Sequence, residues 1–238
     1  MIQPPLRRMC RLLPLLAALL ATHASSVLAS EGSRVALPSQ FGGAFSVPVA
    51  SIKGLHFHNT MHQKYDFSCG SAALATMLTH HYAYPVSEQD VFREMYERGD
   101  QNKIRKEGFS LLDMKNYLEA HGFEGDGFVA EIEQLLTAGI PAIALIKENG
   151  YYHFVVIKGM RNDRVLVGDP SAGTRTMPYT KFKGLWVNHI LFVIRNKLEL
   201  AKFNTDNDWR VAPSAPYVNS VHRGAAEPFF PKRGPSDY

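Results

Sequence analysis

The stretch Gln63–Ala73, with the sequence QKYDFSCGSAA, places a cysteine between a loop that carries a glutamine and a run of small residues typical of a helix start. The chain has two cysteines, and the other, Cys10, lies in a segment that resembles an export signal. A single thiol in an exported protein has no intramolecular partner for a structural disulfide. We therefore interpret Cys69 as a candidate nucleophile, with a small buried residue at a helix start as the alternative.

The first 29 residues show the three parts of a signal peptide. Three arginines precede an apolar run at residues 12–20, which is far shorter than the roughly 20 residues that span a bilayer. Val27-Leu28-Ala29 then offers a cleavage site. We predict a periplasmic or secreted protein with no transmembrane segment in its mature form. Removal of the leader takes three arginines and no acid, so the net charge falls from +4 to +1, which disfavours a nucleic-acid partner.

The remaining sequence predicts an α+β fold, because helical periodicity comes first and strand-like runs follow. Ser87 and Ser110 each precede an acidic residue by three positions, a pattern typical of a capped helix start. The predicted helices cover residues 69–82, 87–99, 110–121 and 131–138, and the predicted strands cover 46–52, 55–61, 141–147, 152–160, 164–168 and 187–194. The last four strands favour an antiparallel sheet with the helices packed on it.

Four segments follow along the chain. Residues 1–29 form the signal peptide, and residues 30–45, rich in small and polar residues, form a flexible entry. The folded domain covers residues 46–196. Residues 197–238 contain recurrent prolines without periodicity and predict a disordered or loosely docked tail.

Two polar residues at strand ends complete a candidate catalytic set. His153 begins the apolar run Tyr152–Ile157, and Asp169 ends the run from Arg164. The short turn at Asn162 predicts that these two strands pair as a hairpin, which brings His153 beside Asp169. A carboxylate in that position can fix the tautomer of an imidazole that acts as a base. The alternatives are a core histidine and a common Asp-Pro turn.

Cys69 and Gln63 supply the other two parts of acyl-transfer chemistry. A helix N-terminus favours an anion, so the sequence predicts a lowered pKa for the thiol of Cys69. Gln63 carries amide donors six positions before the cysteine, and with the backbone N–H of Cys69 it is a candidate oxyanion donor. A loop glutamine in solvent is the alternative for Gln63.

Taken together, the motifs Gln-x5-Cys-Gly-x-Ala-Ala, Tyr-His-Phe-Val-Val and Gly-Asp-Pro resemble those of the papain-like bacteriocin-processing (double-glycine leader) peptidase family over about residues 46–195. The resemblance implies a papain-like fold, with a helical lobe on an antiparallel sheet and the active site in a cleft. It implies Cys69 as nucleophile, His153 as base, Asp169 as orienter and Gln63 as oxyanion donor. It also implies a peptide or protein substrate cut after small residues such as glycine.

The chain differs from the best-known members of that family, which are fused to a membrane exporter with an ATPase, because it lacks a Gly-x4-Gly-Lys-Ser/Thr phosphate loop. The resemblance to exported accessory proteins implies a fibre subunit, amyloid-like or pilus, or a secretion component as the substrate. Two other functions stay open: a non-catalytic peptide-binding module and a cell-wall amidase. We expect no cofactor, and His56, His58 and His62 lack a cysteine or acid at metal-ligand spacing.

Overall fold

The computed structural model describes residues 34–36, 46–48 and 51–211. The chain divides into two compact units, Met1–Val49 and Ala50–Tyr238. In the first unit, β1 (Arg34–Ala36) pairs antiparallel with β2 (Ser46–Pro48). This pair places a strand within the predicted flexible entry, and of the predicted strand at 46–52 the structure describes Ser46–Pro48 as a strand and places Ile52 in the helix α1. The signal-peptide prediction lies outside the described residues.

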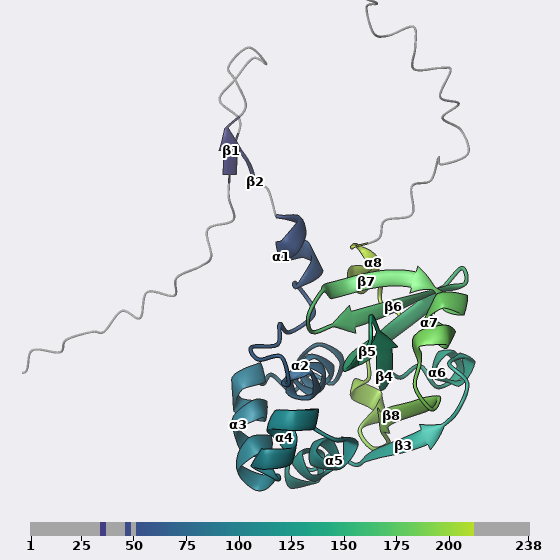
Figure 1. Ribbon diagram of the computed structural model, residues 1–238. Coiled ribbons are helices and arrows are strands. Elements are labelled where there is room, and N and C mark those ends of the chain that lie inside the picture. The colour runs from purple at the N-terminus through teal and green to yellow at the C-terminus, as the bar shows by residue number, and fades with distance from the viewer. Residues whose placement is uncertain (1–33, 37–45, 49–50, 212–238) are drawn as a thin grey trace, which may run out of the picture. The chain divides into compact units, whose positions relative to one another are not determined.

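A six-stranded antiparallel sheet forms the centre of the second unit, in the order β3-β8-β4-β5-β6-β7 (Figure 1). The bounds are β3 Gly125–Val129, β4 Ala142–Glu148, β5 Tyr151–Arg161, β6 Arg164–Asp169, β7 Gly173–Pro178 and β8 Ile190–Ile194. The four strands predicted after residue 140 are confirmed. The sequence analysis missed β3, which contains two glycines, and β7, which begins at a glycine and ends at a proline.

The helices confirm the four predicted ones and add others. The confirmed helices are α2 (Cys69–Thr76), which continues as a π-helical turn at Met77–His81, α3 (Glu88–Arg98), α5 (Leu111–Ala120) and α6 (Glu133–Ala138). The sequence analysis missed α1 (Ile52–His56), α4 (Gln101–Glu107) and α7 (Tyr179–Leu185). The predicted strand at 55–61 is wrong, because Ser51 caps α1 there by accepting a hydrogen bond from the Gly54 N–H at 2.9 Å.

Local capping explains where the confirmed helices begin and end. Ser110 and Asp113 form a reciprocal capping box at the start of α5. The Ser87 side chain accepts from the Asp90 N–H at 3.1 Å at the start of α3. Gly139 ends α6 with φ of +67°, a left-handed conformation that suits glycine. No helix among the described residues is both long and apolar enough to cross a bilayer.

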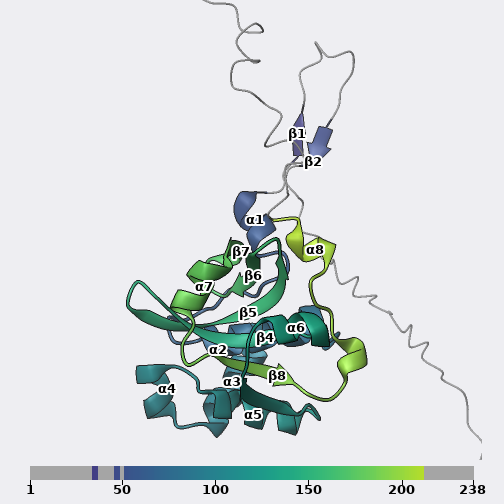
Figure 2. The same ribbon diagram turned by 90° about the vertical axis from the view of Figure 1, so that its right-hand side faces the viewer.

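Both faces of the sheet are covered, so alternate residues of β5 enter two different apolar clusters. Phe154 and Val156 pack with the buried helix α2 and with α3 and α5, which lie together beside it (Figure 1). Val155 and Ile157 pack in the second cluster, with α7 on that side. In the perpendicular view, α7 lies apart from α3, α4 and α5, across the curled sheet (Figure 2). Every residue of α2 is buried, which makes this helix the centre of the first cluster.

Of the two states predicted for the tail from residue 197, disordered or loosely docked, the part up to residue 211 is docked. Leu198–Leu200 forms a 3-10 turn, and α8 (Asp206–Trp209) follows. The buried Asp208 accepts a hydrogen bond from the fully buried ammonium of Lys158 at 2.8 Å, and the Asn204 N–H donates to the Lys158 carbonyl at 2.7 Å. The segment therefore docks on β5 through polar contacts, which apolar periodicity does not reveal. Residues 212–238 lie outside the description.

These contacts predict that Asp208→Asn destabilises the fold while Asp206→Asn does not. Loss of the Asp208 charge leaves the buried ammonium of Lys158 without a carboxylate, although it keeps its bond to the Asn59 carbonyl, and this loss costs about 3 kcal/mol or more. Asp206 pairs with Arg161 at 2.8 Å, but its side chain is 94% exposed, so its loss should change the stability by less than about 0.5 kcal/mol. Urea unfolding of both variants measures the difference, and equal midpoints would contradict a docked C-terminal segment.

Candidate active site

Cys69 is the first residue of α2, as predicted, and is only 8% exposed. Burial raises the pKa of its thiol, and the backbone groups of Phe154 and Gly70 act in the opposite direction without cancelling that effect. The predicted lowering of the pKa at the helix N-terminus is therefore wrong for the substrate-free protein. Desolvation of the thiolate outweighs these backbone hydrogen bonds, so the resting thiol carries its proton.

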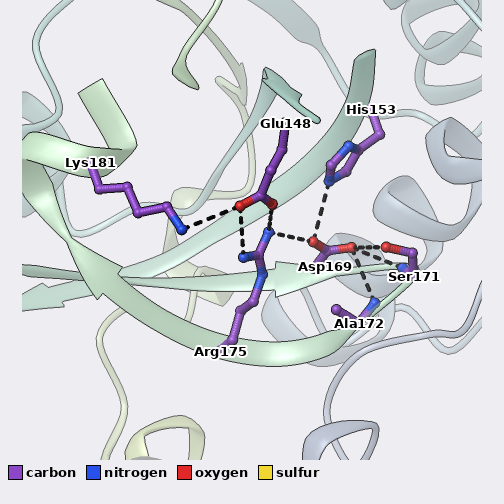
Figure 3. Close-up of polar contacts among 7 residues, drawn as sticks. All are labelled: Glu148, His153, Asp169, Ser171, Ala172, Arg175 and Lys181. Atoms are coloured by element: carbon purple, nitrogen blue, oxygen red, sulfur yellow. Dashed lines mark hydrogen bonds and ion pairs between the residues drawn. The ribbon is translucent and has the colours of Figure 1, made fainter. Parts of the chain in front are cut away.

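The sheet places His153 beside Asp169, as the hairpin prediction required. His153 Nε2 lies 3.2 Å from Asp169 Oδ2 (Figure 3). The pairing of β5 with β6 contains a bulge between Ile157 and Gly159, and beyond it Val156 pairs with Gly168. This register brings the start of β5 to the end of β6. With Nε2 directed at the carboxylate, Nδ1 is the imidazole nitrogen that stays available for another partner.

The carboxylate of Asp169 is held by several donors. Its Oδ1 accepts from the Ser171 N–H at 2.9 Å, the Ser171 hydroxyl at 2.7 Å and the Ala172 N–H at 3.3 Å. Burial acts to raise the pKa of Asp169, but the hydrogen bonds from His153 and Ser171 outweigh it and hold that pKa well below its ordinary value. The carboxylate is 1% exposed and ionised, so it is a fixed acceptor for the imidazole.

Gln63 lies beside the same site, although its amide is occupied. Its Nε2 donates to the Tyr65 carbonyl at 3.0 Å and to the Asp66 carbonyl at 3.4 Å. Its backbone N–H donates to the Pro170 carbonyl at 3.0 Å, which fixes this loop next to the residue after Asp169. The structure thus brings the predicted Gln63 to the predicted site, with its side-chain donors turned into its own loop.

An open cavity of about 760 Å³ connects these side chains. Its lining includes the predicted Gln63, His153 and Asp169. The lining also includes Asp66 and residues at or beside the β4–β5 turn, which are Glu148, Asn149, Tyr151 and Tyr152. Cys69 adjoins β5 at Phe154, directly after His153, but among the described residues no hydrogen bond joins the thiol to the imidazole. The structure therefore brings His153, Asp169 and Gln63 to one cavity and leaves Cys69 buried next to it.

Two charged residues of this cavity were missed by the sequence analysis. Arg175 on β7 donates to Asp169 Oδ2 at 2.9 Å and to Glu148 Oε2 at 2.5 Å (Figure 3). Lys181 of α7 lies 3.4 Å from Glu148 Oε1. Glu148 comes directly after the predicted strand at 141–147, and Arg175 lies on a strand that was not predicted, so no pattern marked either of them.

The donor set does not favour a metal ion. Glu148, His153 and Asp169 each place one potential ligand atom within 4.8 Å of the others. The guanidinium of Arg175 already lies between the two carboxylates and supplies the positive charge there. The histidines weighed as metal ligands make local bonds instead: His58 Nδ1 contacts Asn59 Oδ1 at 2.6 Å, and His62 Nδ1 contacts the Gln63 carbonyl at 2.6 Å.

A family model, the Peptidase C39 family, matches residues 58–197. The chain belongs to this family. The match confirms the family resemblance derived from the sequence, the α+β peptidase fold and the class of enzyme, a cysteine peptidase. The matched range ends where the C-terminal segment docked through Asp208 begins.

Three of the related proteins show the range of similarity. The "Probable functional amyloid protease FapD" of Pseudomonas aeruginosa is 42% identical over 159 residues, which cover 67% of this chain and 69% of the relative. The protein of the same name from Pseudomonas fluorescens is 40% identical over 166 residues, 69% of this chain and 73% of the relative. A crystal structure of a double glycine motif protease from an AMS/PCAT transporter, in complex with the leader peptide, is 25% identical with a TM-score of 0.47, and the alignment covers 57% of this chain and 89% of the other.

The raised pKa of Cys69 predicts slow alkylation at mildly acidic pH. Because the reactive form is the thiolate, iodoacetamide should modify Cys69 slowly at about pH 6. The rate of modification should rise as the pH is raised into the alkaline range. Intact-protein mass spectrometry measures the rate, and Cys69→Ala reports the background from any other thiol. Fast modification near about pH 6 would show instead that an imidazolium already stabilises the thiolate in the resting protein.

Proposed function

We propose that this Peptidase C39 member is an exported peptidase that cleaves after small residues, with Cys69 as nucleophile, His153 as base, Asp169 as orienting group and Gln63 as oxyanion donor. The observation that carries the proposal is the hydrogen bond from His153 to the buried Asp169. His153 lies on β5, the strand that packs against the cysteine helix α2. A cysteine peptidase needs a base of defined orientation beside its thiol, and this pair is formed before any substrate binds.

The contacts suggest the order of proton transfers. The resting thiol is protonated, so His153 acts through Nδ1 as a general base while Nε2 stays on Asp169. Attack of the sulfur on the peptide carbonyl forms the carbon–sulfur bond, and the imidazolium then protonates the leaving amine as the carbon–nitrogen bond breaks. Water, deprotonated by the same imidazole, attacks the thioester and releases the acid and the thiol.

The oxyanion donors are the Cys69 backbone N–H and the Gln63 amide. The N–H of Cys69 belongs to the first turn of α2, where backbone donors lack helical partners. The side-chain amide of Gln63 donates two hydrogen bonds in the substrate-free protein, and the one to the Asp66 carbonyl is long, at 3.4 Å. One amide hydrogen can therefore turn toward the cavity at a small cost while the 3.0 Å bond to Tyr65 holds the side chain.

The relatives suggest the class of substrate and the compartment. The two Pseudomonas relatives are named as functional amyloid proteases, which favours an exported, fibre-forming subunit or a component of its secretion system as the substrate. The leader sequence favours the periplasm or the extracellular space. A small residue before the scissile bond is the preference that the family resemblance implies.

A non-catalytic binding module is the second candidate, and the buried, protonated thiol of Cys69 favours it. Such a module would bind peptide in the cavity at His153 without turnover. Turnover itself separates the two functions, because a binding module shows none and Cys69→Ala leaves its peptide affinity intact.

Substitution of the three proposed catalytic residues should reduce turnover in a defined order. With quenched fluorescent peptides that carry Gly-Gly or Val-Val before the cut, the wild type should cleave the first and not the second. Cys69→Ala should abolish cleavage, because the nucleophile is lost, and His153→Ala should leave less activity than Asp169→Asn, because an orienting group assists a base without replacing it. Near-wild-type rates for all three variants would exclude the triad.

Gln63→Ala should lower kcat by about 100-fold with little change in KM, because the amide is proposed to bind charge that exists only in the tetrahedral intermediate. Gln63→Glu keeps the shape, removes the donor and adds a negative charge beside the oxyanion, so it should be at least as slow as the alanine variant. An increase in KM alone in the alanine variant would make Gln63 a substrate contact and assign the oxyanion to other donors.

A further inference from the structure

Arg175 joins two carboxylates at the edge of the cavity. One of its terminal nitrogens lies 2.9 Å from Asp169 Oδ2 and 2.5 Å from Glu148 Oε2, and the other lies 3.4 Å from Glu148 Oε1. Asp169 Oδ2 is also the oxygen that contacts His153 Nε2. The guanidinium and the imidazole therefore share one acceptor atom, and any change in the charge around Arg175 reaches the imidazole through that oxygen.

The register of the sheet brings these residues together. Arg175 pairs with Val167 across β7 and β6, and His153 pairs with Ile146 across β5 and β4. Ile146 and Val167 lie on the same face of the sheet, in the second apolar cluster. Glu148 comes two residues after Ile146, and Asp169 comes two residues after Val167. Because side chains alternate along a strand, both carboxylates lie on that same face. Four neighbouring strands thus contribute one charged or titratable group each to the same corner of the sheet.

Solvent screens these charges only weakly. The side chains of Arg175 and Glu148 are 24% and 19% exposed, and that of Asp169 is 1% exposed. Burial acts against the charge of Arg175, but the hydrogen bonds that it donates to Glu148 and the charge of Asp169 raise its pKa. The hydrogen bonds from Arg175 lower the pKa of Glu148. All three groups stay ionised, and with His153 neutral the cluster carries one net negative charge, which Lys181 offsets at 3.4 Å from Glu148.

We propose that Arg175 is a positioning residue of the peptidase site, and that Glu148 balances its charge so that Asp169 remains a strong acceptor for His153. The proposal rests on the proposed function, in which His153 is the base. Without Arg175, Asp169 Oδ2 keeps the imidazole as its one donor among the described residues, and Glu148, with an oxygen within 4.8 Å of the imidazole, becomes a second acceptor for it. Without the charge of Glu148, the guanidinium draws fully on Asp169 and weakens its bond to the imidazole.

Removal of either charge therefore shifts the titration of the imidazole in opposite directions. Arg175→Gln leaves two uncompensated carboxylates near His153, which favours the imidazolium, whereas Glu148→Gln leaves an uncompensated cation, which disfavours it. The other charged or titratable groups that line this cavity are Asp169 of β6, Tyr151 and Tyr152 of β5, and Asp66 of the loop before α2, while Lys181 of α7 contacts Glu148 and Cys69 of α2 lies beside Phe154. None of these is changed by the two substitutions, so the sign of the shift reports the balance between Arg175 and Glu148.

Nuclear magnetic resonance of the imidazole tests this without a substrate. In a Cys69→Ala background, with the signal assigned by its loss in His153→Gln, Arg175→Gln should raise the midpoint of the imidazole titration and Glu148→Gln should lower it. The double variant should return near the parent. Arg164→Gln removes the same charge from an exposed position on β6 and should not shift the midpoint. Shifts in the same direction, or none, would overturn the proposal.

Kinetics on the Gly-Gly peptide supply the second readout. Arg175→Gln should lower kcat by about 10- to 100-fold with little change in KM, because a misplaced base slows the chemical step. Arg175→Lys, which keeps the charge but not the planar fork, should recover only part of this loss. A change in KM alone would make Arg175 a substrate contact. If the wild type has no peptidase activity, the proposed function fails. Titration shifts in opposite directions would still establish that Arg175 and Glu148 balance the charge on Asp169.

Discussion

The buried carboxylate of Asp169 is the group on which the arrangement of the site depends. An ionised carboxylate at 1% exposure is costly unless donors surround it, and here His153, Arg175 and the Ser171–Ala172 turn all supply them. Each donor comes from a different element or turn. Because all must converge on two oxygen atoms, the ends of β5, β6 and β7 are fixed relative to one another. The orientation of the imidazole is thus a consequence of satisfying a buried charge.

Burial of α2 serves the fold and opposes the chemistry at the same position. Gly70 allows close packing, since a Cβ there would lie 2.9 Å from the Cβ of Phe109. The same close packing desolvates the thiol of Cys69 and raises its pKa beyond what the first turn of the helix offsets. A thiol that is protonated at rest needs a base to remove its proton when it attacks the substrate, and in the proposed mechanism His153 is that base. This dependence gives the positioning groups around Asp169 their importance.

Sequence patterns predicted the elements whose signal is local and missed those whose signal is tertiary. Cys69, His153 and Asp169 could be placed because a helix start and one tight hairpin decide their positions. By contrast, α4 is polar apart from the buried Ile104, and β7 reads as a turn flanked by Gly173 and Pro178. The thiol pKa was predicted in the wrong direction for a related reason. A helix dipole can be inferred from the sequence, whereas the packing that desolvates the sulfur cannot.

The C-terminal segment extends the folded unit beyond the residues that the family model matches. The family match stops at residue 197, yet Asp208 and Asn204 bind Lys158, the residue at the bulge of β5. The bulge shifts the register by one residue, and the register decides whether the start of β5 meets the end of β6. The ammonium of this buried lysine contacts the Asn59 carbonyl within the family domain, but its charged partner comes from outside that domain. The segment to residue 211 therefore packs on the strand that carries His153, at the bulge that shifts the register of that strand with β6.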